Sequence, residues 1–291
     1  MSHPKEIDAW GQRAVVVTGA STGIGRATVV ELVSAGYQVF ATVRREADAE
    51  SLRQQFPELV TPVIMDLLDE DSIRAAGEVI NSAGPLFGLV NNAGAALPGP
   101  LETIPIEVFR RQIEVNLTAQ LLVTQVMLPA LHRSAEQIGD ARIIMIGSIG
   151  GRLSGPILGG YGAAKHGLVG LSSSLRAELA PFNIKVLLIE PGAIATPIWD
   201  RGRAAGDELQ SRDSEINARY ADQIEAATKM AKRLAESGPD PSVPAKIILD
   251  ALQSKNPPPR QVVGREAKVV AAMVRVLPFR TLYRLTGARR R

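Results

Sequence analysis

The stretch that decides the fold is Val15-Val16-Val17-Thr18-Gly19-Ala20-Ser21-Thr22-Gly23-Ile24-Gly25, and a segment with helical spacing follows it over 26–35. Three consecutive valines are typical of a strand that is buried on both faces. Gly19 permits a tight turn, and Gly23 and Gly25 remove side chains where backbone must approach a pyrophosphate. A helix that begins there offers free N–H groups to an anion. The stretch predicts a strand, a phosphate-binding turn and a helix, with a plain strand-to-helix turn as the alternative.

The same alternation continues along the chain. Apolar runs rich in β-branched residues occur at 13–18, 38–43, 62–65, 88–91, 141–147, 185–189 and 261–264. Segments with helical spacing lie between them at 26–35, 71–83, 106–130 and 161–180. Unbroken apolar strands that alternate with helices predict an α/β fold, in which a mostly parallel, seven-stranded sheet carries helices on both faces.

Composition indicates one large soluble domain. The 291 residues are 45% hydrophobic and 22% charged, without an internal repeat or a linker rich in Gly, Ser or Pro. We therefore predict a single domain over 1–291, with a core over about 12–196, a polar helical insertion over about 197–240 where a substrate lid would lie, and a basic extension over about 265–291. The absence of cysteine excludes disulfides, thiolate catalysis and cysteine-ligated metals.

Tyr161 and Lys165 form a candidate proton-transfer pair. Residues four apart lie on the same face of a helix, so the ammonium group can approach the phenol. Lowering a phenol pKa from about 10 to about 7 requires about 4 kcal/mol. One positive charge at contact distance supplies about 4 kcal/mol at an effective dielectric constant near 20. The spacing therefore predicts an acid–base device whose tyrosine has a lowered pKa.

Seven short motifs together resemble the short-chain dehydrogenase/reductase superfamily. They are Thr18 to Gly25, Asp66, Asn91-Asn92-Ala93-Gly94, Asn116, Ser148, Tyr161 with Lys165, and Pro191-Gly192 with Thr196. Each is short, and their common order is what makes the resemblance specific. The resemblance implies a Rossmann-like, doubly wound fold and an oxidoreductase that acts on CH–OH groups with NAD(P).

The resemblance also implies four catalytic roles. Tyr161 is expected to act as general acid in reduction and as general base in oxidation. Lys165 is expected to lower the phenol pKa and to bind the nicotinamide ribose, and Ser148 to polarise the substrate oxygen. Asn116 is expected to hold a helix irregularity that lets a water connect Lys165 to solvent.

Most of the cofactor site follows from the resemblance as well. The expected contacts are Gly19, Ser21, Thr22, Gly23, Ile24, Gly25, Asp66, Leu67, Asn92, Ala93, Gly94, Tyr161, Lys165, Pro191, Gly192, Ile194 and Thr196. The choice of cofactor is argued from charge. Val43 occupies the place where an acid would bind the ribose 2′-hydroxyl, and Arg44 and Arg45 follow it. We predict NADP(H), with NAD(H) left open because acidic residues lie nearby.

The substrate walls are expected on either side of the catalytic residues. The candidates are Ser148, Leu153, Ile157, Leu158, Trp199 and Tyr220. Most of these are apolar, which favours a hydrophobic alcohol or ketone. Arg152 and Arg201 are candidates to bind a substrate carboxylate. The three histidines are scattered, so no catalytic metal is expected.

The carboxyl end is strongly basic. Residues 265–291 contain eight arginine or lysine residues and one acidic residue, whereas the whole chain has a net charge of +3. Apolar residues there follow helical spacing, a pattern compatible with a helix on a membrane surface or packed on the core or a second subunit. We expect no nucleic-acid partner for this basic end. With no apolar run long enough to span a bilayer, we expect a cytoplasmic homodimer or homotetramer, with membrane contact through this end as an option.

Segments 257–264 and 277–278 resemble the hydroxysteroid and retinol dehydrogenase-like branch of the superfamily. This resemblance implies a lipid-like or steroid-like carbonyl substrate. Two other functions stay open. One is a 3-oxoacyl thioester reductase, for which the basic tail would recognise an acidic carrier protein. The other is a cofactor-binding sensor or scaffold without turnover.

Overall fold

The computed structural model describes residues 13–210 and 214–285. The predicted basic extension is therefore described only as far as Leu285, and Arg289, Arg290 and Arg291 lie outside the described residues, as do the first twelve residues of the chain.

Seven strands form one sheet in which every pair of neighbours is parallel. They are β1 (Ala14–Val17), β2 (Gln38–Val43), β3 (Val60–Ile64), β4 (Gly88–Asn91), β5 (Ala141–Ile146), β6 (Ile184–Pro191) and β7 (Arg260–Val263). Their order is β3-β2-β1-β4-β5-β6-β7. The order reverses between β1 and β4, and a ligand crevice is expected outside the carboxyl ends of the strands at such a point. The predicted fold class is confirmed.

Alternate strand residues divide the core into two layers. Val16 packs into a cluster with α3 (Glu70–Ser82), α5 (Ala119–Ile138) and α6 (Gly159–Leu179). Val15 and Val17 point to the opposite face. The helices on that face are α1 (Gly23–Ser34), α2 (Glu46–Gln55) and α9 (Ser242–Gln253). Because successive strand residues face opposite sides, three consecutive valines serve both layers.

The helix predicted over 106–130 is longer and less regular than the sequence indicated. It consists of α4 (Ile106–Ile113), a π-helical turn at Glu114–Thr118 and α5, which continues to Ile138. Short 3-10 turns occupy Ile149–Gly151 before α6 and Ala180–Phe182 after it. The π-helical turn lies within the stretch that contains Asn116, so it bears directly on the site.

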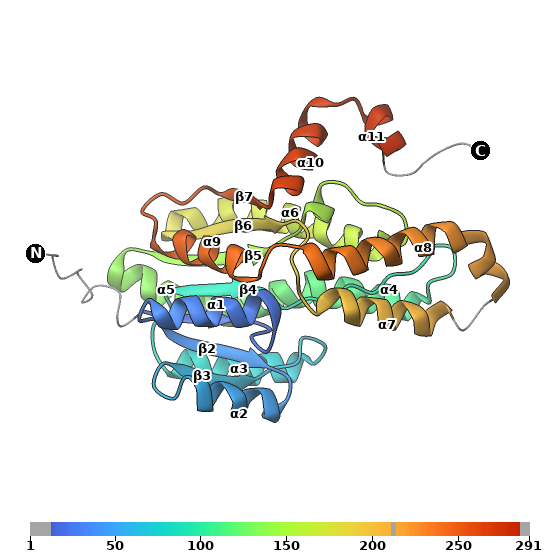
Figure 1. Cartoon of the computed structure of the whole chain (residues 1–291). Coiled ribbons are helices and arrows are strands. Elements are labelled where there is room, and N and C mark those ends of the chain that lie inside the picture. The colour runs from blue at the N-terminus through green and yellow to red at the C-terminus, as the bar shows by residue number, and fades with distance from the viewer. Residues whose placement is uncertain (1–12, 211–213, 286–291) are drawn as a thin grey trace, which may run out of the picture.

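The polar insertion after β6 is helical. It forms α7 (Ile198–Gln210) and α8 (Ser214–Ser237), which pack side by side at the end of the sheet where the strands terminate (Figure 1). After β7, α10 (Arg265–Val276) and α11 (Phe279–Leu285) stand away from the sheet (Figure 1). Within residues 13–210 and 214–285, no helix is both long and apolar enough to cross a bilayer.

Candidate active site

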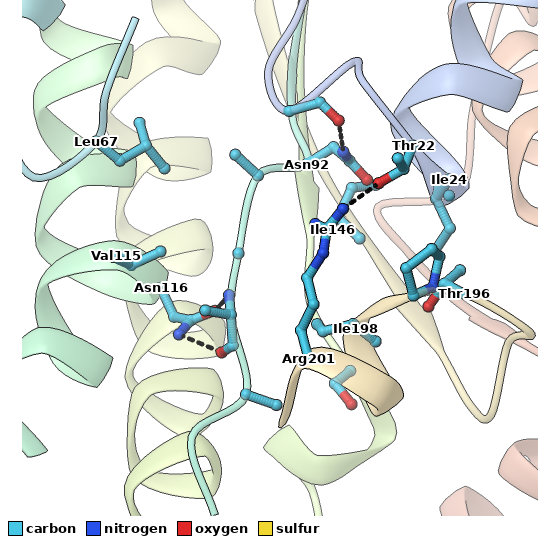
Figure 2. A pocket seen from close by; sticks show the side chains of 18 of the residues that line it. Thr22, Ile24, Leu67, Asn92, Val115, Asn116, Ile146, Thr196, Ile198 and Arg201 are labelled. Carbon is cyan, nitrogen blue, oxygen red and sulfur yellow. Dashed lines mark hydrogen bonds between the residues drawn. The ribbon is translucent and has the colours of Figure 1, made fainter. Parts of the chain in front are cut away.

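A cavity of about 280 Å³ lies at the carboxyl ends of the strands. This volume approaches the lower end of the range of small-molecule sites. It joins five groups of predicted residues, partly visible in Figure 2. They are Gly19 and Ser21 to Ile24 from the glycine turn; Arg44, Asp66 and Leu67; Asn92 to Gly94; Asn116, Ser148, Tyr161 and Lys165; and Pro191, Gly192, Ile194 and Thr196.

The glycine turn connects β1 to α1. Gly19 and Gly23 have φ angles of 67° and 58°, a left-handed region that a side chain would strain. Gly25 has a different reason to be glycine. A Cβ there would lie 2.3 Å from the carbonyl oxygen of Gly19 and 2.5 Å from Nδ2 of Asn92. Gly25 therefore lets the helix pack on its own turn. The sequence indicated Gly25 as a cofactor contact, but the residue does not line the cavity.

The loop after β4 is held against this turn by hydrogen bonds. The backbone N–H groups of Asn92 and Ala93 both donate to Oγ1 of Thr18, at 2.9 Å. Nδ2 of Asn92 donates to the carbonyl oxygen of Thr18 at 2.8 Å. The two strand ends at the reversal point are thus joined side chain to backbone, which fixes the floor of the cavity.

Asn116 is fully buried in the π-helical turn. Its Nδ2 donates to the carbonyl oxygens of Ala95 and Gln112, each at 2.9 Å, and its Oδ1 accepts from the N–H of Ala95 at 3.3 Å. Figure 2 shows the Asn116 side chain with hydrogen bonds to the neighbouring loop. A Cβ at Gly94 would lie 2.8 Å from that Oδ1. Asn116 thus binds the loop after β4, and a helix irregularity is present where the resemblance implied one. The water link to Lys165 stays a prediction.

Sequence reasoning missed the polar neighbours of Asn116. Gln112 accepts from the N–H of Leu97 at 2.6 Å, and Gln120 donates to the carbonyl oxygen of Ala93 at 2.8 Å. With Thr124, these residues form a buried stripe at intervals of four. The four-residue spacing of these uncharged polar residues was the signal that could have identified them, because a buried polar face needs hydrogen-bonding partners.

Ser148, Tyr161 and Lys165 meet beside the end of β5. Oγ of Ser148 accepts from the N–H of Gly150 at 3.1 Å. Lys165 is 5% exposed, and its Nζ donates to the carbonyl oxygen of Ile146 at 2.8 Å. Nζ also lies 5.8 Å from the centre of the Tyr161 ring. The four-residue spacing brings phenol and ammonium together as predicted, but the hydrogen bond of the ammonium goes to the strand.

The protonation of this pair differs from the sequence expectation. Burial raises the pKa of the Tyr161 phenol, and a hydrogen bond with Ser148 partly offsets that rise. Burial lowers the pKa of Lys165 from 10.5 to about 8. The sequence predicted that Lys165 lowers the pKa of Tyr161, but in the structure the phenol pKa is raised and Ser148 is the group that opposes the rise. The physical reason is that desolvation outweighs a charge whose hydrogen bond goes to Ile146.

A second cavity adjoins the first at the ends of β2 and β3. It is lined by Ser21, Arg44, Arg45, Asp48, Asp66 and Arg201. Arg45 does not lie on the main cavity, and its guanidinium donates to both carboxylate oxygens of Asp48, at 2.8 and 2.9 Å. This hydrogen-bonded pair lowers the pKa of Asp48. The two predicted arginines therefore differ, because only Arg44 lines both cavities.

The predicted substrate walls are divided. Trp199 lines the main cavity, and its Nε1 donates to the carbonyl oxygen of Ile194 at 2.8 Å. Leu153, Ile157, Leu158 and Tyr220 do not line it. Ile157 is buried and accepts from Gly99 at 2.8 Å. The hydroxyl of Tyr220 donates to Oε2 of Glu102 at 2.6 Å, which ties α8 to a surface loop.

Arg152 is not available to bind a substrate carboxylate, which corrects that expectation. It makes an ion pair with Glu190, which is fully buried at the end of β6. Arg260 from β7 makes a second ion pair with the same carboxylate, at 2.6 Å. Burial alone would raise the pKa of Glu190, but hydrogen bonds from Arg260 and Arg152 hold it below its usual value. The cluster ties the loop after Ser148 to the strand that leads into Pro191.

Neither His132 nor His166 lines the main cavity, and His3 lies outside the described residues. His166 is exposed, and its Nδ1 lies 2.8 Å from the carbonyl oxygen of Gly162. The ring of His132 packs edge-on against Phe182. Within the described part of the chain, no three His, Asp or Glu side chains gather in a group that could hold a metal ion.

Comparison with known proteins identifies the family. Residues 13–207 match the family model described as short chain dehydrogenase. The chain is 32% identical to the NADPH-dependent 3-dehydrocapnine reductase of Ornithobacterium rhinotracheale, over 93% of this chain and 94% of that protein. It is 31% identical to human retinol dehydrogenase 16, over 91% of this chain and 84% of that protein.

A solved structure agrees with the fold. A short-chain dehydrogenase from Streptomyces avermitilis superposes with a TM-score of 0.77 and 28% identity, covering 94% of this chain and 96% of that one. The family match covers the glycine turn, both strand ends at the reversal point and the Tyr161 helix. The chain therefore belongs to the short-chain dehydrogenase/reductase family and is an oxidoreductase that acts on CH–OH or carbonyl groups with NAD(P).

Proposed function

We propose that this protein is an NADP(H)-dependent oxidoreductase that interconverts a carbonyl and an alcohol on a hydrophobic, lipid-like or steroid-like substrate. One observation carries the proposal. A single cavity joins the glycine turn of β1 and α1 to Ser148, Tyr161 and Lys165. A nucleotide site and a proton-transfer group that open into the same space meet the geometric need of hydride transfer coupled to protonation.

The residues present fit a nicotinamide dinucleotide. Gly19 and Gly23 contribute no side chains to the turn, and α1 directs its amino terminus toward the cavity. Asp66 and Leu67 would hold the adenine, Asn92 to Gly94 the adenosine ribose, and Pro191 to Thr196 the nicotinamide end. When bound, the dinucleotide supplies or accepts the hydride.

Tyr161 would transfer the proton. Its raised pKa keeps the phenol protonated at neutral pH, which suits a general acid that donates to a carbonyl oxygen. Ser148, hydrogen-bonded to that phenol, would donate to the same substrate oxygen and polarise it. Lys165, with a pKa of about 8, is mostly charged at neutral pH and would bind ribose hydroxyl groups. Asn116 acts as a positioning residue by holding the loop after β4.

A hydrophobic substrate is favoured by the lining of the main cavity. Leu97, Val115, Ile198 and Trp199 contribute apolar surface near the catalytic groups. Arg152 is engaged with buried Glu190, so it offers no carboxylate clamp there. The similarity to human retinol dehydrogenase 16 supports the same substrate class.

NADP(H) is favoured by charge and by similarity. Arg44 lines both cavities at the end of β2, where Val43 stands in place of an acid. A guanidinium binds a ribose phosphate bidentately, whereas an acid would repel it. The relative from Ornithobacterium rhinotracheale is NADPH-dependent by name.

The test combines equilibrium binding with turnover. NADPH and NADH are titrated by fluorescence, and oxidation of the reduced cofactor is then followed with ketones, aldehydes, steroids, retinoids and acyl thioesters. We expect tighter NADPH binding and turnover of apolar carbonyls. Tyr161→Phe should bind NADPH normally and lose at least about 10²-fold in kcat. Near-full activity of that variant would remove Tyr161 from its role, and cofactor binding without any turnover would favour the sensor function.

Assembly and membrane contact form a separate proposal. The side chains of Val269 and Val276 on α10 are 59% and 78% exposed, and Lys268 and Arg275 lie on the same helix. An apolar stripe with basic neighbours suits an anionic bilayer. The variant with both valines changed to glutamate should stay in the soluble fraction when mixed with phosphatidylserine vesicles, whereas the wild type should sediment with them. Equal soluble fractions of the variant and the wild type would contradict the membrane contact.

The oligomeric state is a separate expectation. Analytical ultracentrifugation should show a homodimer or homotetramer, and a monomer would contradict it.

A further inference from the structure

Arg201 connects the insertion to the nucleotide site. It lies on α7, and its Nη2 is 3.4 Å from Oγ1 of Thr22 in the glycine turn. Figure 2 shows its side chain extending from α7 toward Thr22. Arg201 lines both cavities, a property that it shares with Arg44. A side chain from the insertion therefore completes the wall of the nucleotide site.

The charges around Arg201 leave positive charge for a ligand. The second cavity contains three arginines and two carboxylates. Arg45 is committed to Asp48 through a two-point pair. In residues 13–210 and 214–285, neither Arg44 nor Arg201 has a carboxylate within salt-bridge distance. Arg203, two residues further along α7, differs because it pairs with Asp200 at 2.9 Å.

We propose that Arg201 binds the ribose phosphate of NADP(H) together with Arg44, so that α7 of the insertion contributes to the preference for NADP(H) over NAD(H). This inference rests on the proposed function. Two arginines from α7 and the end of β2 converge on the cavity that also contains Ser21 and Asp66. Guanidinium groups bind phosphate through paired, charge-assisted hydrogen bonds, which a ribose hydroxyl cannot replace.

The same helix carries a wall of the substrate space. Ile198 and Trp199 line the main cavity within one helical turn of Arg201. A helix turn is rigid, so an anchor at Arg201 also fixes these apolar side chains in the wall of the main cavity. Binding of the phosphate would therefore order the substrate wall, and NADP(H) and NAD(H) would differ in how firmly they hold α7 in place.

Nucleotide binding separates this inference from the proposed function. NADPH, NADH, adenosine 2′,5′-bisphosphate and 5′-AMP are titrated by calorimetry into the wild type, Arg201→Gln and the matched control Arg203→Gln. Arg201→Gln should weaken NADPH and the bisphosphate about 10-fold, as expected for loss of one charge-assisted contact, and change NADH and 5′-AMP less than about 2-fold. Arg203→Gln should change none of them.

The other outcomes are decisive. Equal weakening of all four ligands would place Arg201 at the diphosphate and overturn the inference. Unchanged NADPH affinity in Arg201→Gln would also overturn the inference, but it would leave the wild-type preference for NADPH intact. A wild type without that preference would overturn both the preference and this inference.

Limited proteolysis of 198–237 tests the coupling to the insertion. Saturating NADPH should protect this segment in the wild type and in Arg203→Gln, and NADH should protect it less. Arg201→Gln should lose the extra protection even when saturated with NADPH. Equal protection of the wild type and Arg201→Gln would overturn the coupling.

Discussion

The two sides of the cavity are built differently. On the nucleotide side, the ends of β1 and β4 are joined through Thr18 and Asn92, and the glycine turn leaves no room for a Cβ at Gly25. On the insertion side, α7 and α8 pack mainly on each other and reach the body through individual contacts such as Arg201 to Thr22 and Tyr220 to Glu102. The nucleotide side is fixed by the sheet, whereas the insertion side is attached to it.

This difference indicates where substitutions should be costly. Backbone that is close-packed at strand ends cannot shift without moving the sheet, so a small addition there is felt fully. A helix held by a few side chains can move by tenths of an ångström at low cost. Four substitutions compare the two sides, from the most disruptive to the least.

Gly25→Ala should have the largest effect. Its new Cβ would lie 2.3 Å from a backbone oxygen, so we expect a loss of about 3 kcal/mol in unfolding free energy and more than about 10-fold in NADPH affinity. Gly170→Ala is the matched control, because Gly170 lies in α6 with nothing within 4 Å. That change should stabilise the helix by up to about 1 kcal/mol. Equal unfolding free energies of Gly25→Ala and Gly170→Ala in urea would refute the close packing of the nucleotide side.

Lys165→Met tests whether the Lys165 ammonium is buried at the end of β5, through the pH dependence of the unfolding free energy. The pKa of Lys165 is about 8 in the folded chain and 10.5 for an ordinary solvated lysine, so the unfolded chain holds the extra proton between these values. Wild-type stability should therefore rise relative to Lys165→Met as pH increases from about 8 to 10.5, by about 2 to 3 kcal/mol. Urea unfolding at several pH values measures the difference. Parallel pH profiles would show that the ammonium is not desolvated.

Gly202→Ala applies the glycine test to the insertion. A Cβ at Gly202 would lie 2.9 Å from the carbonyl oxygen of Ala96, so α7 must shift slightly. The better helix propensity of alanine offsets part of this cost, and the net change in stability should stay below about 1 kcal/mol. KM for the carbonyl substrate should rise several-fold, with NADPH affinity within about 2-fold of wild type. A stability loss as large as that of Gly25→Ala would end the distinction between the two sides.

The same difference explains what the sequence could predict. The strands were predictable because unbroken apolar runs mark them. The cofactor contacts were predictable because the ordered motifs resemble those of a known family, and parallel strands bring the ends that carry these motifs to one edge. The predicted ranges of β2 and β4 coincide with the observed ones, and Asp66 and Asn92 line the cavity as expected.

The substrate wall was less predictable because proximity in sequence to Ser148 does not determine where a side chain points. Ile157 follows the catalytic serine closely, yet it is buried against the loop that contains Gly99. Arg152 looked like a clamp, and only the fold brings buried Glu190 to it. The raised pKa of Tyr161 depends on desolvation, which spacing alone does not reveal.

Tyr220→Phe should have the smallest effect. The sequence indicated Tyr220 as a substrate wall, but its hydroxyl donates to Glu102, and this hydrogen bond raises the pKa of the phenol. Because the contact is on the surface, its loss should leave kcat/KM within about 2-fold of wild type. Glu102→Gln is the control: it keeps a hydrogen-bond acceptor, removes the charge and should return the Tyr220 pKa, followed by ultraviolet absorbance, toward 10. A large rise in KM for Tyr220→Phe alone would mean that α8 closes over the substrate, and the insertion side would then share directly in binding.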